Sequence, residues 1–173
     1  HDVGRGDVVL MQLEVPMPTV VEVARVAGSQ GAIVALNAAP AAILPDELWR
    51  LLHILVVNET EAATLSGGLA PVDAAHLLRR LGNVSVVVTL GSDGCLVAPE
   101  GEADVHHVPA FVPKAIVDAT GAGDAFCGAM VAQLAAGSTL ELAARWGNAA
   151  GSLAVEVLGA IPSMPSEAAI ASR

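Results

Sequence analysis

The sequence is poor in basic and aromatic side chains. Only eight of its 173 residues are Lys or Arg, against 18 Asp and Glu, so the formal net charge is −10, and aromatic residues make up 2%. Proteins that bind nucleic acid or an anionic membrane surface through their overall charge carry the opposite sign. We therefore expect neither partner. A bound polyphosphate would be held by backbone dipoles and cations more than by basic side chains.

Cysteine is also scarce. Cys95 and Cys127 are far apart and match no metal-ligand spacing, so we expect buried thiols and a reducing, cytoplasmic environment. The adjacent His106 and His107 do not predict a metal site, because neighbours on a strand point to opposite faces. Hydrophobic residues make up 54% of the chain, yet no stretch approaches the roughly 20 uninterrupted apolar residues that a membrane helix needs.

Short β-branched apolar runs alternate with amphipathic segments. The runs predict buried parallel strands, and the segments between them predict the crossover helices that parallel strands require. The expected strands are Val8–Leu13, Ala32–Leu36, Ile54–Val57 and Val84–Leu90. The expected helices are about Thr19–Ala27, Pro45–Leu52, Glu59–Ser66 and Val72–Leu81. The pattern favours one α/β domain over residues 1–173, with a three-layer α/β/α, Rossmann-like arrangement.

After Leu90 the pattern changes. A Gly-rich turn precedes two short alternating segments, Cys95–Ala98 and Asp104–Pro109, which predict an antiparallel hairpin at the sheet edge. Two long helices are expected at about Gly123–Ala136 and Leu140–Val157, separated by a Gly and a Ser-Thr pair suited to a C-cap and an N-cap. The segment Gly159–Ser163 is expected to be a loop.

The most informative stretch is Asp118–Phe126, which reads DATGAGDAF. It places small residues at a loop-to-helix junction, where free backbone N–H groups and the helix dipole favour an anion such as phosphate. Asp124 would face that site, where a carboxylate can accept a proton from an attacking hydroxyl. Taken alone, the stretch also fits an ordinary turn whose Asp favours the helix N-terminus.

Polar residues follow the predicted strands at the edge where ligands collect in open α/β sheets. Glu14 follows the first strand, and Asn58 with Glu61 follows the third. An amide and a carboxylate at this place can organise Mg²⁺ and its waters, although their spacing alone favours a helix capping box. Thr89 and the Gly-rich turn after it close the fourth strand. Such a segment is more often an ordinary turn than a nucleotide contact, although its small residues would let a nucleotide approach the backbone closely.

These segments together resemble the PfkB family of carbohydrate kinases, and its ribokinase branch most closely. They occur in the family's order and cover nearly the whole chain. The matching segments are Met11–Glu14, Ala35–Ala41, Leu44–Leu48, Asn58–Ala62, Thr89–Gly94, Asp118–Gly128 and Gly159–Ser163. Ala119 departs from the Thr that the family usually has there.

The resemblance implies the catalytic groups. Asp124 matches the base that deprotonates a sugar's primary hydroxyl, and Gly121, Ala122 and Gly123 match the anion hole for the transferring γ-phosphoryl group. Glu14 matches a sugar-contacting carboxylate, and Glu61 matches the acidic residue that supports Mg²⁺. The positions that match the ATP pocket are Asn58, Thr89, Leu90, Gly91, Ser92, Asp93, Gly94, Gly123, Asp124 and Asn148.

The resemblance also implies a loop that binds K⁺ as an activating monovalent cation. Its matching positions are Asp118, Thr120, Ala154, Val157, Gly159 and Ser163. The implied reaction is ATP-dependent phosphorylation of a sugar, with D-ribose giving ribose 5-phosphate as the first expectation. Another sugar or nucleoside, as in fructokinases or adenosine kinases, and a non-catalytic nucleotide-binding remnant are the alternatives.

The family's N-terminal segment, with its first strands and small β lid, has no counterpart here. The chain begins with His1 and no charged or apolar leader, so we expect it to be the later part of a longer protein. An isolated chain with exposed sheet edges is expected to self-associate. A homodimer of the full-length protein stays open, because family dimers commonly use the lid.

Overall fold

The computed structural model describes residues 3–173, which fall into two compact units. The first unit runs up to Leu90 and also includes Leu96–His106, and the second comprises Gly91–Cys95 and His107–Arg173. The expectation of a single domain stays a prediction. In the described part of the chain, no helix is both long and apolar enough to cross a membrane.

Six strands form one sheet in the order in which they occur along the chain. They are β1 (Val8–Met11), β2 (Ile33–Asn37), β3 (Ile54–Asn58), β4 (Ser85–Thr89), β5 (Cys95–Ala98) and β6 (His106–Val108). The first four pair in parallel, and in this register Asn58 lies opposite Thr89 at the carboxyl edge. The last two form an antiparallel edge pair, which confirms the predicted fold class of a mainly parallel sheet with surrounding helices.

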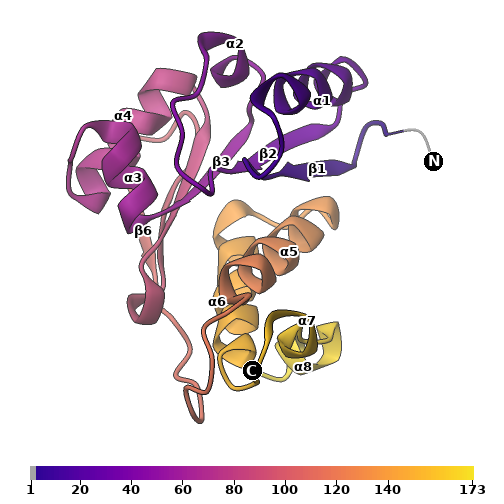
Figure 1. The fold of residues 1–173 in the computed structure, drawn as a ribbon, viewed down its shortest axis with the longest axis vertical. Helices are drawn as coiled ribbons and strands as arrows, with labels where there is room; N and C mark the ends of the chain where they lie inside the picture. Colours follow the sequence, from indigo (N-terminus) through magenta and orange to yellow (C-terminus); the bar gives the residue numbers. More distant parts are fainter. Residues whose placement is uncertain (1–2) are drawn as a thin grey trace. The chain divides into compact units, whose positions relative to one another are not determined.

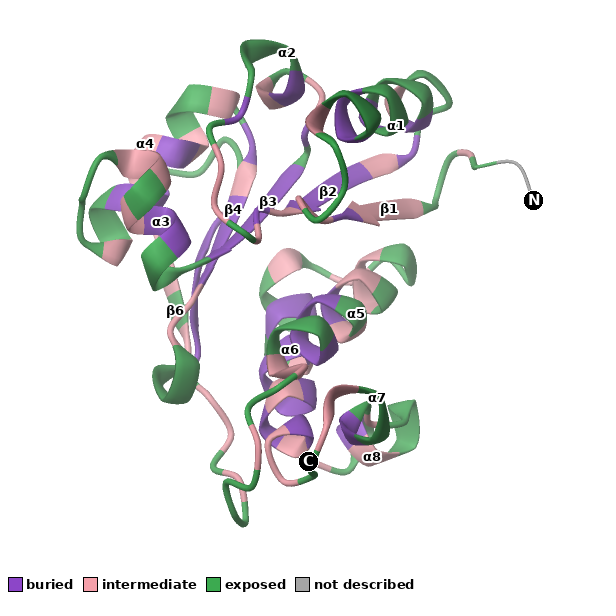
Figure 2. Cartoon of the chain, viewed as in Figure 1, coloured by how far each residue is buried: buried purple, intermediate pink, exposed green. Residues whose placement is uncertain are grey.

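Four helices of the first unit share a hydrophobic core with one face of the sheet (Figure 1). They are α1 (Met17–Ser29), α2 (Asp46–Trp49), α3 (Glu59–Ser66) and α4 (Pro71–Gly82). Every second residue of the parallel strands contributes to this core, including Leu36, Leu55 and Val86, each of which is fully buried. The strands β2, β3 and β4 are buried over most of their length (Figure 2), as expected for apolar runs without a polar face.

Two element boundaries in the first unit differ from the expectation. The helix expected over Pro45–Leu52 is the short α2, because the chain tightens after Trp49, where the Leu51 N–H donates to Leu48 O. The first strand ends at Met11 and not at Leu13, since the Leu13 N–H donates to Ala39 O outside the strand ladder. The other strands and helices of this unit lie within a few residues of the predicted bounds.

The second unit is built on two packed helices, α5 (Ala122–Ala135) and α6 (Leu140–Ala154). They approach closely at Gly147, where an added Cβ would lie 2.8 Å from the Phe126 ring. The predicted N-cap of α6 is confirmed, because Thr139 Oγ1 accepts a hydrogen bond from the Leu142 N–H at 3.3 Å. The loop expected at Gly159–Ser163 instead contains the short helix α7 (Ala160–Ser163), followed by α8 (Glu167–Ala171). Pro162 is tolerated there because the first turn of a helix does not need its N–H.

Candidate active site

The start of α5 is open to solvent and carries an acidic side chain. Gly121 is the N-cap residue with φ of 81°, and a Cβ there would lie 3.0 Å from the Ala160 Cα, so the turn requires glycine. Nothing lies within 4 Å of the place where a Cβ of Gly123 would be. Asp124 stands at position N3 of the helix and is exposed. The Ala122 N–H donates to Ala119 O at 3.2 Å, so of the predicted anion-hole amides this one is already engaged in a turn.

Asp118 organises the loop that precedes α5. Its Oδ1 accepts from the N–H of Thr120 at 2.9 Å and from the Thr120 hydroxyl at 2.7 Å, and its Oδ2 accepts from the Gly159 N–H at 2.9 Å. These donors, led by the Thr120 hydroxyl, lower the pKa of the Asp118 carboxyl. The arrangement brings together three of the residues predicted to form the cation loop.

The remaining cation-loop residues lie at the end of α6 and on α7. The Ala154 carbonyl accepts from the Val157 N–H at 3.1 Å. Ser163 is buried, and its hydroxyl donates to Ala160 O at 2.7 Å, inside its own short helix. That hydrogen bond uses the hydroxyl proton and leaves oxygen lone pairs for another partner.

In the first unit, Asn58 and Glu61 form a reciprocal capping box at the start of α3. The Glu61 N–H donates to Asn58 Oδ1 at 2.9 Å, and the Asn58 N–H donates to Glu61 Oε2 at 2.8 Å. Glu61 is buried, with 8% of its surface exposed. Within residues 3–173, no group of three or more His, Cys, Asp or Glu side chains is arranged to hold a metal ion. Glu61 is therefore not part of a cluster of protein ligands.

Thr89 neighbours Asn58 across the paired strands β3 and β4. Its hydroxyl lies 3.5 Å from Val57 O, which is a long hydrogen bond, and Leu90 after it is half-buried. The polar residues predicted at these two strand ends thus lie at one edge of the sheet. Sequence reasoning had placed them there from the rule for parallel strands.

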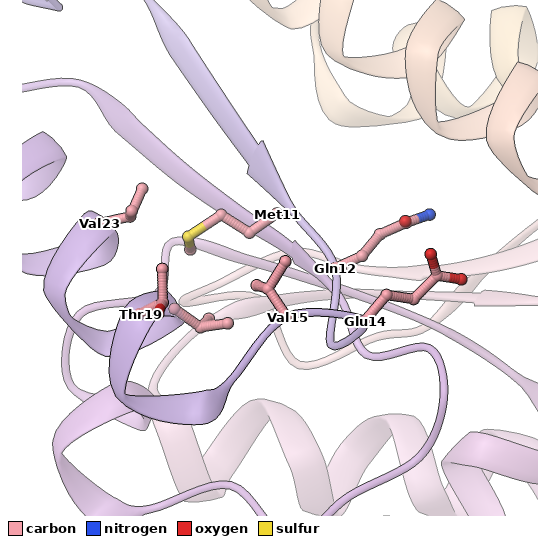
Figure 3. A pocket seen from close by; sticks show the side chains of 7 residues that line it. Met11, Gln12, Glu14, Val15, Thr19 and Val23 are labelled. Carbon is pink, nitrogen blue, oxygen red and sulfur yellow. The ribbon is translucent and has the colours of Figure 1, made fainter.

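Glu14 lies on the loop after β1 and lines a shallow pocket of about 300 Å³. The pocket is mostly apolar, and Figure 3 shows the polar ends of Gln12 and Glu14 on the same side of the chain, pointing away from Val23. The lining residues are Met11, Gln12, Glu14, Val15, Thr19, Val20 and Val23. A mostly apolar lining with a few polar side chains, here Gln12, Glu14 and Thr19, is typical of small-molecule sites.

The Gly-rich turn after β4 has a fixed shape. Gly91, Ser92 and Asp93 form one turn of 3₁₀ helix, and Gly94 follows with φ of 94°. A Cβ at Gly94 would lie 2.2 Å from the Val108 O, so no other residue fits. The His107 Nε2–H donates to Asp93 O at 2.6 Å and ties the turn to β6.

Asn148, predicted as an ATP contact, is buried on α6 with its amide already bonded to protein. Its Nδ2 donates to Val108 O at 3.0 Å and to Pro109 O at 3.2 Å, and lies 3.6 Å from Cys95 Sγ. Burial raises the pKa of the Cys95 thiol to about 12, which leaves the thiol protonated at neutral pH. These contacts give Asn148 a structural role, holding α6 to the chain segment after β6.

Comparison with known proteins decides the family. The model of the pfkB family carbohydrate kinases matches residues 3–167. The chain belongs to the pfkB family of carbohydrate kinases. Among its relatives, the ribokinase of Staphylococcus aureus is 39% identical over 92% of this chain and 54% of its own length. The chain thus spans about half the length of the curated relatives it matches.

Solved structures in the family agree with the fold. A ribokinase of Arabidopsis thaliana complexed with ribose and ATP is 34% identical and superposes with a TM-score of 0.89, over 95% of this chain and 55% of that one. A ribokinase of Thermotoga maritima is 36% identical, with a TM-score of 0.86 over 96% of this chain and 56% of that one. The family membership predicted from the ordered motifs is confirmed.

The predicted residues of this pfkB-family site are distributed over both units. Glu14, Asn58, Glu61, Thr89 and Leu90 belong to the first unit, and the residues from Gly91 to Gly94 and from Asp118 onward belong to the second. The hydrogen bonds that hold the loops carrying these residues could not be predicted from the sequence. The hydrogen bond between His107 and Asp93 and the one between Lys114 and Glu156 join positions 14 and 42 residues apart, which no local pattern signals.

Proposed function

We propose that this chain forms the nucleotide-binding and phosphoryl-transfer part of an ATP-dependent carbohydrate kinase. The observation that carries the proposal is the start of α5, where Asp124 is exposed at the third helical position and the space beside Gly123 is open. A phosphate placed there meets the positive end of the helix dipole. The neighbouring carboxylate is then in place to accept the proton of an attacking hydroxyl.

Phosphoryl transfer suits a site with few basic side chains. The reaction depends mainly on alignment of donor and acceptor and on stabilisation of charge, so little covalent chemistry is asked of the protein. Asp124 serves as the base, and the Gly123 N–H donates to the transferring group. The Ala122 N–H donates to Ala119 O at 3.2 Å and holds the turn that precedes Gly123. Asn58, Thr89 and the turn Gly91–Gly94 receive the nucleotide, and Asn148 holds the nearby backbone of Val108 and Pro109.

The sugar is proposed to be D-ribose, phosphorylated on its primary hydroxyl. The relatives named ribokinase support this choice, as does a solved relative whose complex contains ribose and ATP. Glu14 supplies a carboxylate at the pocket beside β1, where carboxylate oxygens can accept hydrogen bonds from sugar hydroxyls. Another pfkB-family acceptor, as in fructokinases or adenosine kinases, is the second candidate. In the described part of the chain, this pocket has only three polar lining residues, Gln12, Glu14 and Thr19, and so few polar groups do not single out one sugar.

Mg²⁺ is proposed to enter with ATP and to neutralise the charge of its phosphates. Glu61 fits a supporting role, because its Oε2 caps α3 while its other oxygen stays available to a water of the hydrated ion. K⁺ is proposed to bind the loop organised by Asp118, where backbone carbonyls and the lone pairs of Ser163 Oγ are hard oxygen ligands. Both residue sets have the oxygen chemistry that these cations prefer.

The proposal is tested by measuring ATP consumption of the full-length protein against a panel of sugars and nucleosides, with and without K⁺. Turnover with ribose that rises with K⁺ is the expected result. If the protein turns over only fructose or only a nucleoside, the assignment as a kinase stands and D-ribose is no longer the proposed substrate. ATP binding with no turnover on any acceptor would favour a non-catalytic nucleotide-binding remnant, and no ATP binding at all would reject both readings.

A further inference from the structure

The segment from Val112 to Thr120 leads directly into the start of α5 and has no helix or strand of its own. Its backbone is held instead by residues at the end of α6. The N–H groups of Val117 and Asp118 both donate to Val155 O, at 2.7 and 3.2 Å. The position of Asp118, and with it the loop before Asp124, thus depends on contacts made by the neighbouring residues of α6.

Glu156 holds the earlier part of the same segment. Its Oε1 accepts from the Lys114 N–H at 2.7 Å and from Arg173 Nη2 at 2.8 Å. The same guanidinium nitrogen donates to Val112 O at 2.8 Å. One carboxylate and one guanidinium therefore fix two backbone groups that are two residues apart.

The pair is more shielded than an ordinary surface ion pair. The side chains of Arg173 and Glu156 are 13% and 18% exposed, whereas the partners in the Arg25–Glu47 pair are 49% and 51% exposed. Hydrogen bonds to a charged, shielded acceptor are stronger than those between neutral groups.

We propose that Glu156, clamped by Arg173, is a positioning residue for the phosphoryl-transfer site. It fixes the segment 112–120 so that Asp118 and the start of α5 keep the geometry that the cation and the phosphate require. The inference rests on the proposed function, and it adds two residues that lie outside the cation, nucleotide and sugar sets described above. Their loss should weaken the response to K⁺ and slow turnover, while sugar affinity stays unchanged.

The test compares three variants of the full-length protein with a matched control. Glu156→Ala removes the acceptor and the charge, Glu156→Gln keeps an acceptor for the Lys114 N–H but loses the charge, and Arg173→Gln removes the clamp. Glu47→Gln is the control, because it breaks an ion pair in the first unit. Hydrogen exchange at residues 114–120 and steady-state kinetics over a K⁺ titration are measured for each.

In Glu156→Ala, exchange at Lys114 should rise by at least roughly tenfold, the factor that corresponds to losing one hydrogen bond to a charged group. The half-saturating K⁺ concentration should rise and kcat should fall, with KM for the sugar unchanged. Glu156→Gln and Arg173→Gln should lie between Glu156→Ala and the wild type, and Glu47→Gln should match the wild type. Hydrogen exchange and the K⁺ response should be closer to wild type in Glu156→Gln than in Glu156→Ala. A purely ionic contact would not give this difference, because both variants lack the charge.

Unchanged exchange at 114–120 in Glu156→Ala would overturn the inference, and so would raised exchange with an unaltered K⁺ response in an active enzyme. Both outcomes leave the kinase assignment in place. A wild-type protein that turns over no acceptor would instead reject the proposed function, and the catalytic consequence of Glu156 would fall with it.

Discussion

Asn58 and Glu61 satisfy one another's backbone N–H groups at the first turn of α3, through hydrogen bonds of 2.9 and 2.8 Å. The two residues proposed to serve the nucleotide and its Mg²⁺ are therefore also the residues that begin the helix. A single substitution can disturb either role, so the choice of replacement decides which role is tested. Gln is the useful replacement for Glu61, because a capping box accepts Glu or Gln at this position.

Glu61→Gln should keep the fold and lose Mg²⁺-dependent activity. The amide oxygen of Gln can still accept from the Asn58 N–H, whereas the negative charge that supports the hydrated cation is removed. Unfolding in urea should be nearly unchanged, and the Mg²⁺ concentration needed for half-maximal turnover should rise. Glu59→Gln is the matched control, since Glu59 is exposed in the same helical turn. An equal effect of both variants would mean that general charge, and not position 61, supports the metal.

Asp124→Asn should lower kcat by at least ~10², the usual share of a general base. The side chain keeps its size and its place at the start of α5, so ATP affinity and thermal stability should change little. The readouts are kcat from steady-state assays and ATP affinity from calorimetry. Glu141→Gln provides the comparison, because Glu141 is likewise an acidic residue in the first turn of a helix, α6. Near-normal turnover of the Asp124 variant would reject its role as the base.

Asn148→Ala should destabilise the second unit by about 1 kcal/mol, the usual net contribution of a hydrogen bond between partly buried groups. Two carbonyls, those of Val108 and Pro109, lose their donor in this variant. Chemical unfolding followed by circular dichroism measures the change. Ser152→Ala on the same helix is the control, because the buried Ser152 hydroxyl bonds only to Ala149 O within α6. If the variant instead keeps full stability and loses only ATP affinity, Asn148 is a nucleotide ligand after all.

Asp118→Asn should destabilise the protein at neutral pH but not in acid. Because the Thr120 hydroxyl, the Thr120 N–H and the Gly159 N–H lower the folded-state pKa of Asp118, the stabilisation is complete above the unfolded-state pKa of about 3.9 and disappears as the pH falls through the lower folded-state value. The difference in free energy of unfolding between wild type and variant should therefore be constant from neutral pH to about pH 5 and shrink below about pH 4.

Urea unfolding at several pH values gives this profile. Thr120→Val removes the donor with the largest effect on Asp118 and should shift the acid loss of stability toward higher pH. A difference that stays constant down to the lowest pH would show that Asp118 acts through packing and not through its charge.

The parallel part of the fold could be predicted from sequence because its signals are local. The runs Ala32–Leu36 and Ile54–Val57 are β-branched or apolar and bounded by polar residues, and the structure has the parallel strands β2 and β3 there. The prediction was wrong at Gly159–Ser163, where Gly and Pro suggested a loop. Pro162 lies within the first turn of α7, where a missing N–H costs nothing.

The site could be predicted only as far as its motifs extend. The motifs indicated the glycines and acidic residues at the start of α5, and the structure leaves Asp124 exposed there. The role of Asn148 could not be predicted, because its partners lie 39 and 40 residues earlier in the chain. Such contacts depend on how segments pack, which residue spacing does not encode.

The order of the parallel strands bears on how the first unit assembles. Each of β1 to β4 pairs with its successor in the chain, so no later strand has to insert between two that are already bonded. When strands are added one after another at one edge of the sheet, each connecting loop stays short and no chain segment has to pass through another loop. During synthesis on the ribosome, β2, β3 and β4 can therefore each pair with a strand that has already been made.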